Sequence, residues 1–150
     1  MPRAPFVMQH GMTLPELTLS IALLGLLTAI AIPKYQETLD RVAVDRSAYA
    51  LVAAHHRARI AAILESQPSL LQFTPDSLVI RIRRGSGNSL YWNGPGPAAR
   101  RVQLTGPGKA VVFSPTGLTM GFANGTWVLR RGQAYRRVVT SRLGRARILR

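Results

Sequence analysis

The sequence predicts an α+β fold in which a long N-terminal α-helix, membrane-spanning in its first part, packs on a small antiparallel β-sheet or sandwich head. Three observations predict it. Residues 17–32 carry no charge, helical apolar periodicity continues to about residue 64, and from Pro68 onward short β-branched runs alternate with Gly, Pro and Asn. The chain has no cysteine, so a small head would depend on its apolar core alone.

The first element is the apolar segment with a carboxylate at its entrance. Counted from Met12, it reaches 21 residues, close to the ~20 that a helix needs to cross a ~30 Å hydrocarbon layer. An ionised Glu16 in lipid is costly and needs a cationic partner. Cleavage after Gly11 would create an α-amino group on Met12, and in a stack of identical anchors Glu16 of one chain could pair with the amine of the next.

This stretch resembles a known processing signal. Gly11, Met12, Thr13, Leu14, Glu16 and Leu17, followed by AIAIPKY at 29–35, are similar to the class III signal of type IV pilins and pseudopilins. The resemblance implies a pilin-like fold, cleavage after Gly11 by a prepilin peptidase, N-methylation of Met12, and assembly through Glu16 with other pilin subunits and the pilus assembly machinery. It divides the chain into a leader (1–11), a transmembrane and assembly helix (12–33), its amphipathic continuation (34–66) and a basic β-rich head (67–150).

The same resemblance implies a single-pass protein of the inner membrane, with its head in the periplasm and incorporated into a pilus or pseudopilus. Two other readings of the segment stay open, an ordinary membrane anchor and a secretory signal peptide cleaved after Ala31. A signal peptide usually has its basic region directly before the apolar run. Here only Arg3 and His10 precede Glu16.

The second element is the continuation of the helix. Large apolar residues recur at three- and four-residue steps after residue 34, and no proline follows until Pro68. We therefore expect one helix from about residue 12 to about residue 64, whose second part packs on the head through an apolar stripe. That stripe consists of Tyr35, Leu39, Val42, Tyr49, Ala53, Ile60 and Ile63.

The remaining elements are short strands. We expect them at 78–83, 90–92, 101–104, 110–113, 118–122, 126–131, 135–140 and 146–149, separated by Gly-, Pro- and Asn-containing breakers. The Asn124–Gly125 pair lies between two such strands and is typical of a two-residue β-hairpin turn.

Charge is distributed unevenly along the chain, which has a formal net charge of +14. All six acidic residues lie at or before residue 76, whereas residues 77–150 contain 14 Lys and Arg, 13 of them Arg. This pattern indicates an anionic partner such as nucleic acid or acidic lipid. Arginine suits bidentate phosphate contacts better than lysine does.

The C-terminal end resembles the FimT/GspH minor-pilin family. The resemblance rests on Gly144, Arg145 and Arg147, which match a Gly-Arg-x-Arg segment, and on an upstream FSPTG stretch at 113–117. In FimT-type members this segment is associated with DNA binding during natural transformation. Arg145 and Arg147, at i and i+2, would point to one side of an extended strand. The further residues that we expect to contribute to DNA binding are Arg142, Arg150, Arg136 and Arg137.

Several alternatives to a DNA-binding minor pilin stay open. The arginines could form a solvated face or attract anionic lipid headgroups, and the chain could be a type II secretion pseudopilin, a structural priming or tip subunit without DNA binding. We expect no catalytic residues, no cofactor and no metal site. His55 and His56 lack Asp, Glu or Cys at metal-ligand spacing and are expected to be partly packed or solvent-facing on the helix.

Overall fold

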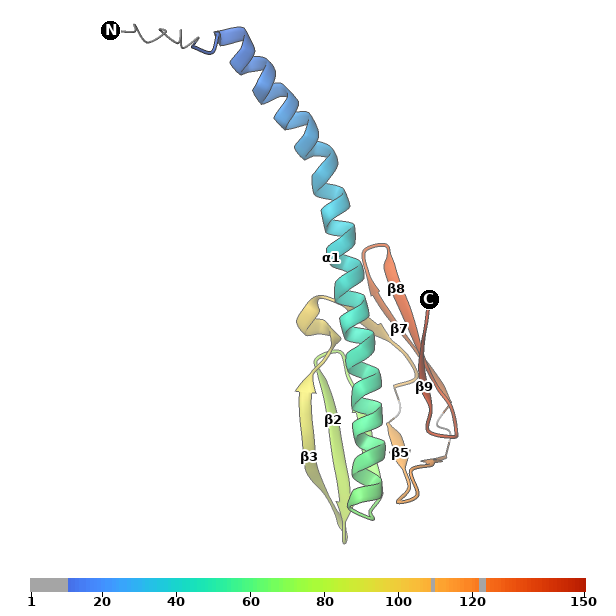
Figure 1. Cartoon of the computed structure of the whole chain (residues 1–150). Helices are drawn as coiled ribbons and strands as arrows, with labels where there is room; N and C mark the ends of the chain where they lie inside the picture. The colour runs from blue at the N-terminus through green and yellow to red at the C-terminus, as the bar shows by residue number, and fades with distance from the viewer. Residues whose placement is uncertain (1–10, 109, 122–123) are drawn as a thin grey trace, which may run out of the picture. The chain divides into compact units, whose positions relative to one another are not determined.

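The computed structural model describes residues 11–108, 110–121 and 124–150, which divide into two units at residue 36. The predicted helix is confirmed as α1 (Leu14–Leu64), whose first part belongs to the first unit and whose remainder belongs to the second (Figure 1). It is long enough to span a membrane, and its most apolar window has a mean hydropathy of 1.9. Within this first unit every described side chain from residue 11 to 36, apart from half-buried Ser20, is exposed.

The N-terminus of α1 carries one of the two contacts of a capping box, the one from the Thr13 N–H to the Glu16 side chain. The Thr13 N–H donates to Glu16 Oε2 at 3.5 Å, and the Leu17 N–H donates to the Thr13 carbonyl at 3.1 Å. The spacing of a threonine and a glutamate three residues later is typical of helix starts, because each satisfies a backbone donor that the helix cannot. Glu16 therefore also stabilises the first turn of its own helix.

The second unit, residues 37–150, contains two antiparallel sheets against which α1 lies (Figure 1). The five-stranded sheet has the order β3-β2-β1-β5-β6, with β1 (Ser69–Phe73), β2 (Ser77–Arg84), β3 (Gly87–Pro95), β5 (Val111–Phe113) and β6 (Thr119–Met120). The four-stranded sheet has the order β4-β7-β8-β9, with β4 (Gln103–Thr105), β7 (Gly125–Arg131), β8 (Ala134–Thr140) and β9 (Ala146–Leu149). A short 3₁₀-helix, η1 (Pro97–Arg100), precedes β4.

The core forms where both sheets meet an alanine-rich face of α1. The helix contributes Val44, Leu51 and a series of fully or almost fully buried alanines at 48, 54, 58, 61 and 62. Because alanine projects only one carbon, the strands can pack close to the helix backbone at protein-interior density. From the sheets, Phe113 and Leu129 are completely buried in this core.

The prediction that the apolar stripe of α1 packs on the head is wrong, because the stripe lies on the opposite face of the helix. Tyr49 is 67% exposed and Ile60 is 53% exposed, and Leu39, Val42 and Ile63 are also exposed. The helix is thus apolar on two faces: small side chains pack on the sheets, while the larger ones point away from them. We call Leu39, Val42, Tyr49, Ala53, Ile60 and Ile63 the outer helix stripe.

The hairpin predicted at Asn124–Gly125 is wrong. β6 pairs with β5 in one sheet, whereas β7 begins at Gly125 in the other, so the chain crosses between sheets at this point. Gly125 serves a packing role instead, since a Cβ there would lie 2.7 Å from the Trp127 ring. Strand β1 was not predicted either, because Pro68 and Pro75 leave only a short run between them.

Candidate nucleic-acid interface

The four-stranded sheet separates its arginines onto two faces. On the inner face, towards α1, Leu129 and Val138 are buried. Arg131 and Arg136 lie on the same face, because side chains two residues apart in a strand share a side. The Arg131 Nε lies 2.8 Å from Asp40 Oδ1, and the Arg136 Nε lies 2.7 Å from Asp45 Oδ1. Both inner arginines therefore form ion pairs with carboxylates of the helix.

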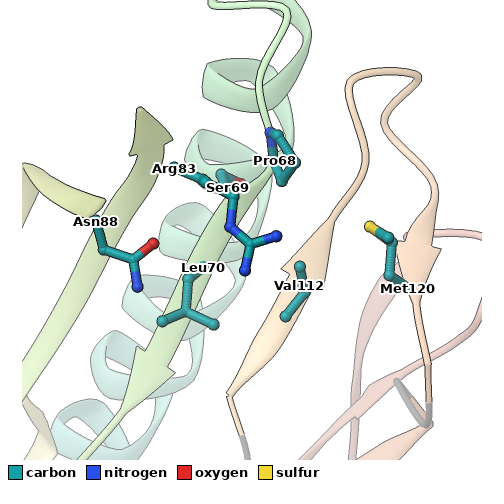
Figure 2. A pocket seen from close by; sticks show the side chains of 7 residues that line it. All are labelled: Pro68, Ser69, Leu70, Arg83, Asn88, Val112 and Met120. Carbon is teal, nitrogen blue, oxygen red and sulfur yellow. The ribbon is translucent and has the colours of Figure 1, made fainter. Parts of the chain in front are cut away.

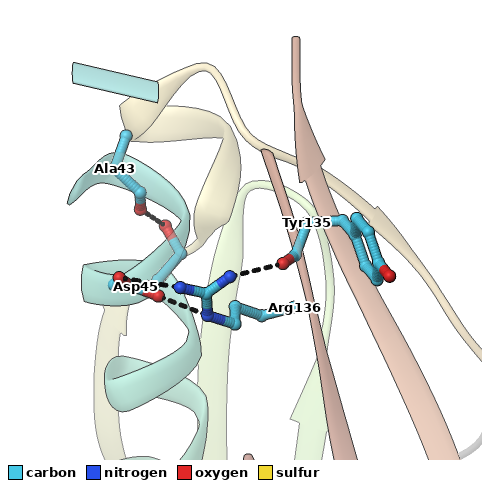
Figure 3. A network of polar contacts seen from close by, with 5 residues as sticks. Ala43, Asp45, Tyr135 and Arg136 are labelled. Atoms are coloured by element: carbon cyan, nitrogen blue, oxygen red, sulfur yellow. Dashed lines mark hydrogen bonds and ion pairs between the residues drawn. The ribbon is translucent and has the colours of Figure 1, made fainter. Parts of the chain in front are cut away.

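Arg136 is fixed by three contacts to two groups, the Asp45 carboxylate and the Tyr135 carbonyl, as Figure 3 shows. Besides its Nε contact, Nη2 donates to Asp45 Oδ2 at 3.2 Å and Nη1 donates to the Tyr135 carbonyl at 2.9 Å. A bidentate pair of this kind has a fixed geometry. Arg136 was expected to contact DNA, but its guanidinium is engaged in holding β8 to α1, and we leave it out of the candidate interface.

We expect Arg136→Ala to lower the free energy of unfolding by about 1 kcal/mol, a modest value because the pair is partly exposed to solvent. Denaturant unfolding followed by tryptophan fluorescence measures this effect. The neighbouring Arg137→Ala, on the opposite face of β8, is the control and should change stability by less than about 0.5 kcal/mol. Equal destabilisation by both variants would contradict the structural role of the Asp45–Arg136 pair.

On the outer face of this sheet the arginines are exposed. Arg130, Arg137 and Arg147 are exposed residues on β7, β8 and β9, and the part of the chain described here offers none of them an ion pair. Arg137 Nη2 donates to the Arg150 carbonyl at 3.5 Å, which places the last residue beside β8. The backbone of the exposed Arg150 therefore lies next to Arg137 on this face.

The β8–β9 turn is built around Gly144. Its N–H donates to the Ser141 carbonyl at 3.0 Å, and the Ser141 N–H donates to the Arg145 carbonyl at 2.9 Å. Gly144 has φ +70°, a backbone conformation that side chains disfavour, and a Cβ there would lie 2.8 Å from the Gly117 carbonyl oxygen. The glycine is buried against the upstream turn, so it shapes the loop and does not itself face a ligand.

Two further contacts hold this turn, and sequence reasoning missed one of the residues involved. Arg59 of α1 donates from Nη1 to the Gly144 carbonyl at 3.5 Å. The Thr119 N–H donates to the Arg142 carbonyl at 3.4 Å, while the Arg142 side chain is exposed. No local sequence signal marks Arg59, because its partner is 85 residues away.

Arg145 and Arg147 line one shallow groove, as their i, i+2 spacing predicted. The groove has a volume of about 370 Å³, and its other lining residues are Val139, Ser141, Leu143 and Leu149. Two guanidinium groups thus stand beside an apolar floor with no carboxylate in the lining. Such a groove can bind an anion, and nothing in it provides a nucleophile beside a general base.

The predicted processing and assembly residues lie in the first unit. Gly11 and Met12 precede α1 and are exposed, and Glu16 is exposed in its first turn. His56 is exposed, but His55 is completely buried, with its ring 4.9 Å from that of Phe113. The described residues contain no group of three His, Cys, Asp or Glu side chains that could hold a metal ion.

A small pocket also lies on the five-stranded sheet. It has a volume of about 130 Å³ and is lined by Pro68, Ser69, Leu70, Arg83, Asn88, Val112 and Met120 (Figure 2). Arg83 is the only charged side chain among these residues. The pocket is smaller than the groove at β9, and it does not bring two cations together.

A long apolar N-terminal helix followed by a head of antiparallel sheets defines the class of pilins and pseudopilins. The chain belongs to the GspH family, whose model, described as type II transport protein GspH, matches residues 47–144. It is therefore a minor pilin or pseudopilin of a type IV pilus or a type II secretion system, a family of structural subunits that assemble with other pilins.

Relatives and solved structures agree with this family. A fimbrial protein of Pseudomonas aeruginosa is 34% identical over 115 residues, covering 77% of this chain and 73% of its own. The pilin-like protein PilA1 of Thermus thermophilus is 31% identical over 156 residues, covering 93% and 98%. The fold is similar to the type IV minor pilin FimU of P. aeruginosa (17% identity, TM-score 0.60, 71% of this chain and 88% of that one). It is also similar to the minor pseudopilin EpsH of the Vibrio cholerae type 2 secretion system (16% identity, TM-score 0.56, 71% and 95%).

Proposed function

We propose that this chain is a minor type IV pilin whose head binds DNA non-specifically through its basic C-terminal region, for DNA uptake in natural transformation. The observation that carries the proposal is the groove in which Arg145 and Arg147 stand together without a carboxylate. Arginine contacts to phosphates hold a protein on DNA without reading its sequence. Capture of DNA of any sequence requires contacts of this kind.

We also infer how the subunit reaches its filament. A prepilin peptidase cleaves after Gly11 and the new Met12 terminus is methylated, the helix anchors the chain in the inner membrane, and the head lies in the periplasm. Glu16 then pairs with the terminal amine of a neighbouring subunit. The outer helix stripe supports assembly, since its large apolar side chains remain in water until another subunit covers them.

A second candidate function is that of a type II secretion pseudopilin, which would contact only proteins. The GspH family match and the likeness to EpsH favour it. Both functions use the same N-terminal helix and the same outer stripe. The two differ in what the exposed arginines of the head contact.

DNA binding by the full chain in uncharged detergent separates the two functions. We expect fluorescence anisotropy with labelled duplex DNA to report binding that weakens steeply with salt, with a log–log slope of about −0.9 per phosphate contacted. Arg145→Gln/Arg147→Gln should weaken binding about a hundredfold, at roughly tenfold for each charge-assisted contact. The matched control Arg81→Gln/Arg83→Gln removes the same charge from β2 and should have a much smaller effect.

The outcomes are distinct. Loss confined to the Arg145/Arg147 variant supports the DNA-binding minor pilin. Equal loss in the control variant means a diffuse basic surface without a defined site. Absence of binding by the unaltered chain near physiological salt overturns the proposal and leaves the secretion pseudopilin.

A further inference from the structure

On the four-stranded sheet, carboxylates of the helix pair with arginines of one face only, among the described residues. Asp40 and Asp45 neutralise Arg131 and Arg136, both on the inner face of the four-stranded sheet. The outer-face arginines lie in a part of the sequence that contains no Asp or Glu. The uncompensated charge of this sheet is therefore concentrated on one face. A general excess of arginine would instead leave uncompensated charge on both faces.

The outer-face arginines follow a diagonal across the strands. Arg147 on β9 lies opposite Val139 of β8, and Arg137 is two residues from Val139 on the same face. Arg137 in turn lies opposite Val128 of β7, and Arg130 is two residues from Val128 on the same face. Each arginine is thus displaced by one strand and two residues from the one before, a diagonal separation of about 7–8 Å.

The diagonal continues at both ends. Arg130 lies opposite Gln103 of β4, and Arg101 precedes Gln103 by two residues. Arg101 and Arg130 line one hollow of about 290 Å³, which confirms that they are neighbours. At the other end Arg145 shares the β9 groove with Arg147. We call the five residues Arg145, Arg147, Arg137, Arg130 and Arg101 the arginine diagonal.

We propose that the whole arginine diagonal binds the sugar–phosphate backbone of one nucleic-acid strand, so that the binding site spans β9, β8, β7 and the segment just before β4. This inference rests on the proposed function and extends its site beyond the Gly-Arg-x-Arg turn. Regularly spaced guanidinium groups match a polymer of regularly spaced phosphates. A site for one isolated anion would need only the two arginines of the groove.

The side chains beside the diagonal fit the same ligand. Tyr135 is 49% exposed and Leu149 is 45% exposed on this face, and Val128 and Val139 are half-buried there. These groups carry no charge that would repel a phosphate chain. Apolar and aromatic surface between cationic side chains is common where proteins follow a nucleic-acid backbone and contact its bases or sugars.

The decisive variant removes the middle of the diagonal and leaves the turn intact. We expect Arg130→Gln/Arg137→Gln in the full chain to weaken binding to labelled duplex DNA about as much as Arg145→Gln/Arg147→Gln does. The log–log salt slope on duplex should decrease in magnitude by about 1.8, for two lost phosphate contacts. Arg81→Gln/Arg83→Gln again serves as the control of equal charge. Because Arg130 and Arg137 are exposed, the thermal unfolding midpoint should not change.

The length of the oligonucleotide gives a second readout. Affinity should rise with each added phosphate up to about five, the number of arginines in the diagonal, and then level off. If Arg130→Gln/Arg137→Gln matches the Arg81/Arg83 control while the Arg145/Arg147 variant still loses binding, the site is confined to the turn and the diagonal is refuted. If the unaltered chain binds no DNA, the proposed function itself fails.

Discussion

Lowering the pH from 7 to 4 is expected to destabilise the folded head by about 3 kcal/mol through His55 alone. Burial, followed by the nearby charges of His56 and Arg59, lowers the pKa of His55 from 6.5 to about 4. Between these two values the unfolded chain binds a proton that the folded chain excludes. Stability therefore falls as the pH drops below 6.5, and this contribution stops changing below about pH 4.

The effect of His55 can be isolated by comparison with His55→Leu. Neither ring nitrogen of the buried His55 has a hydrogen-bond partner among the described residues, so a leucine of similar volume loses no polar contact. Denaturant unfolding of both chains across this pH range cancels the titration of every other group. If the difference in stability between them did not change with pH, His55 would have to accept a proton in the folded state.

Gly144→Ala is expected to destabilise the head by about 2 kcal/mol, although it removes no charge. The residue has φ +70°, where an added Cβ costs about 1–2 kcal/mol. That Cβ would also lie 2.8 Å from the backbone carbonyl oxygen of Gly117, which cannot move aside as a flexible side chain can. The β8–β9 turn must shift, and with it Arg145. DNA binding should weaken, and the unfolding midpoint should fall.

The control for this substitution is Gly87→Ala. Gly87 lies on β3, has no positive φ, and a Cβ there would meet nothing within 4 Å. We expect it to leave both stability and DNA binding nearly unchanged. Unchanged DNA binding in Gly144→Ala would mean that the position of Arg145 does not depend on this turn.

The extent of the helix was predictable from sequence, whereas its buried face was not. An uncharged run and continued periodicity define a helix of the observed length, from Leu14 to Leu64. The face that packs on the sheets consists mostly of alanines, which contribute little to an apolar pattern. The larger residues, Tyr49 and Ile60 among them, dominate the pattern and point away from the sheets. A stripe of large apolar side chains indicates that this face contacts another apolar surface. The pattern does not show whether that surface belongs to the same chain or to a neighbouring subunit.

The candidate site was predictable in part for a similar reason. The alternation of a strand correctly placed Arg145 and Arg147 on one side. Alternation also puts the adjacent Arg136 and Arg137 on opposite faces, yet the sequence does not say which face meets the helix. The Asp45–Arg136 ion pair decides this, and it depends on tertiary packing. The arginine diagonal needs the register of four strands, which no local pattern specifies.

The ion pairs of the inner face also have a consequence for biosynthesis. Asp45 and Arg136 are 91 residues apart in sequence. Asp45 leaves the ribosome 91 residues before Arg136 and cannot form this ion pair until β8 has been synthesised. Contacts this distant in sequence slow folding. Two ion pairs join the second sheet to the helix, Asp40–Arg131 on β7 and Asp45–Arg136 on β8, and a chain truncated before β8 lacks the second of them.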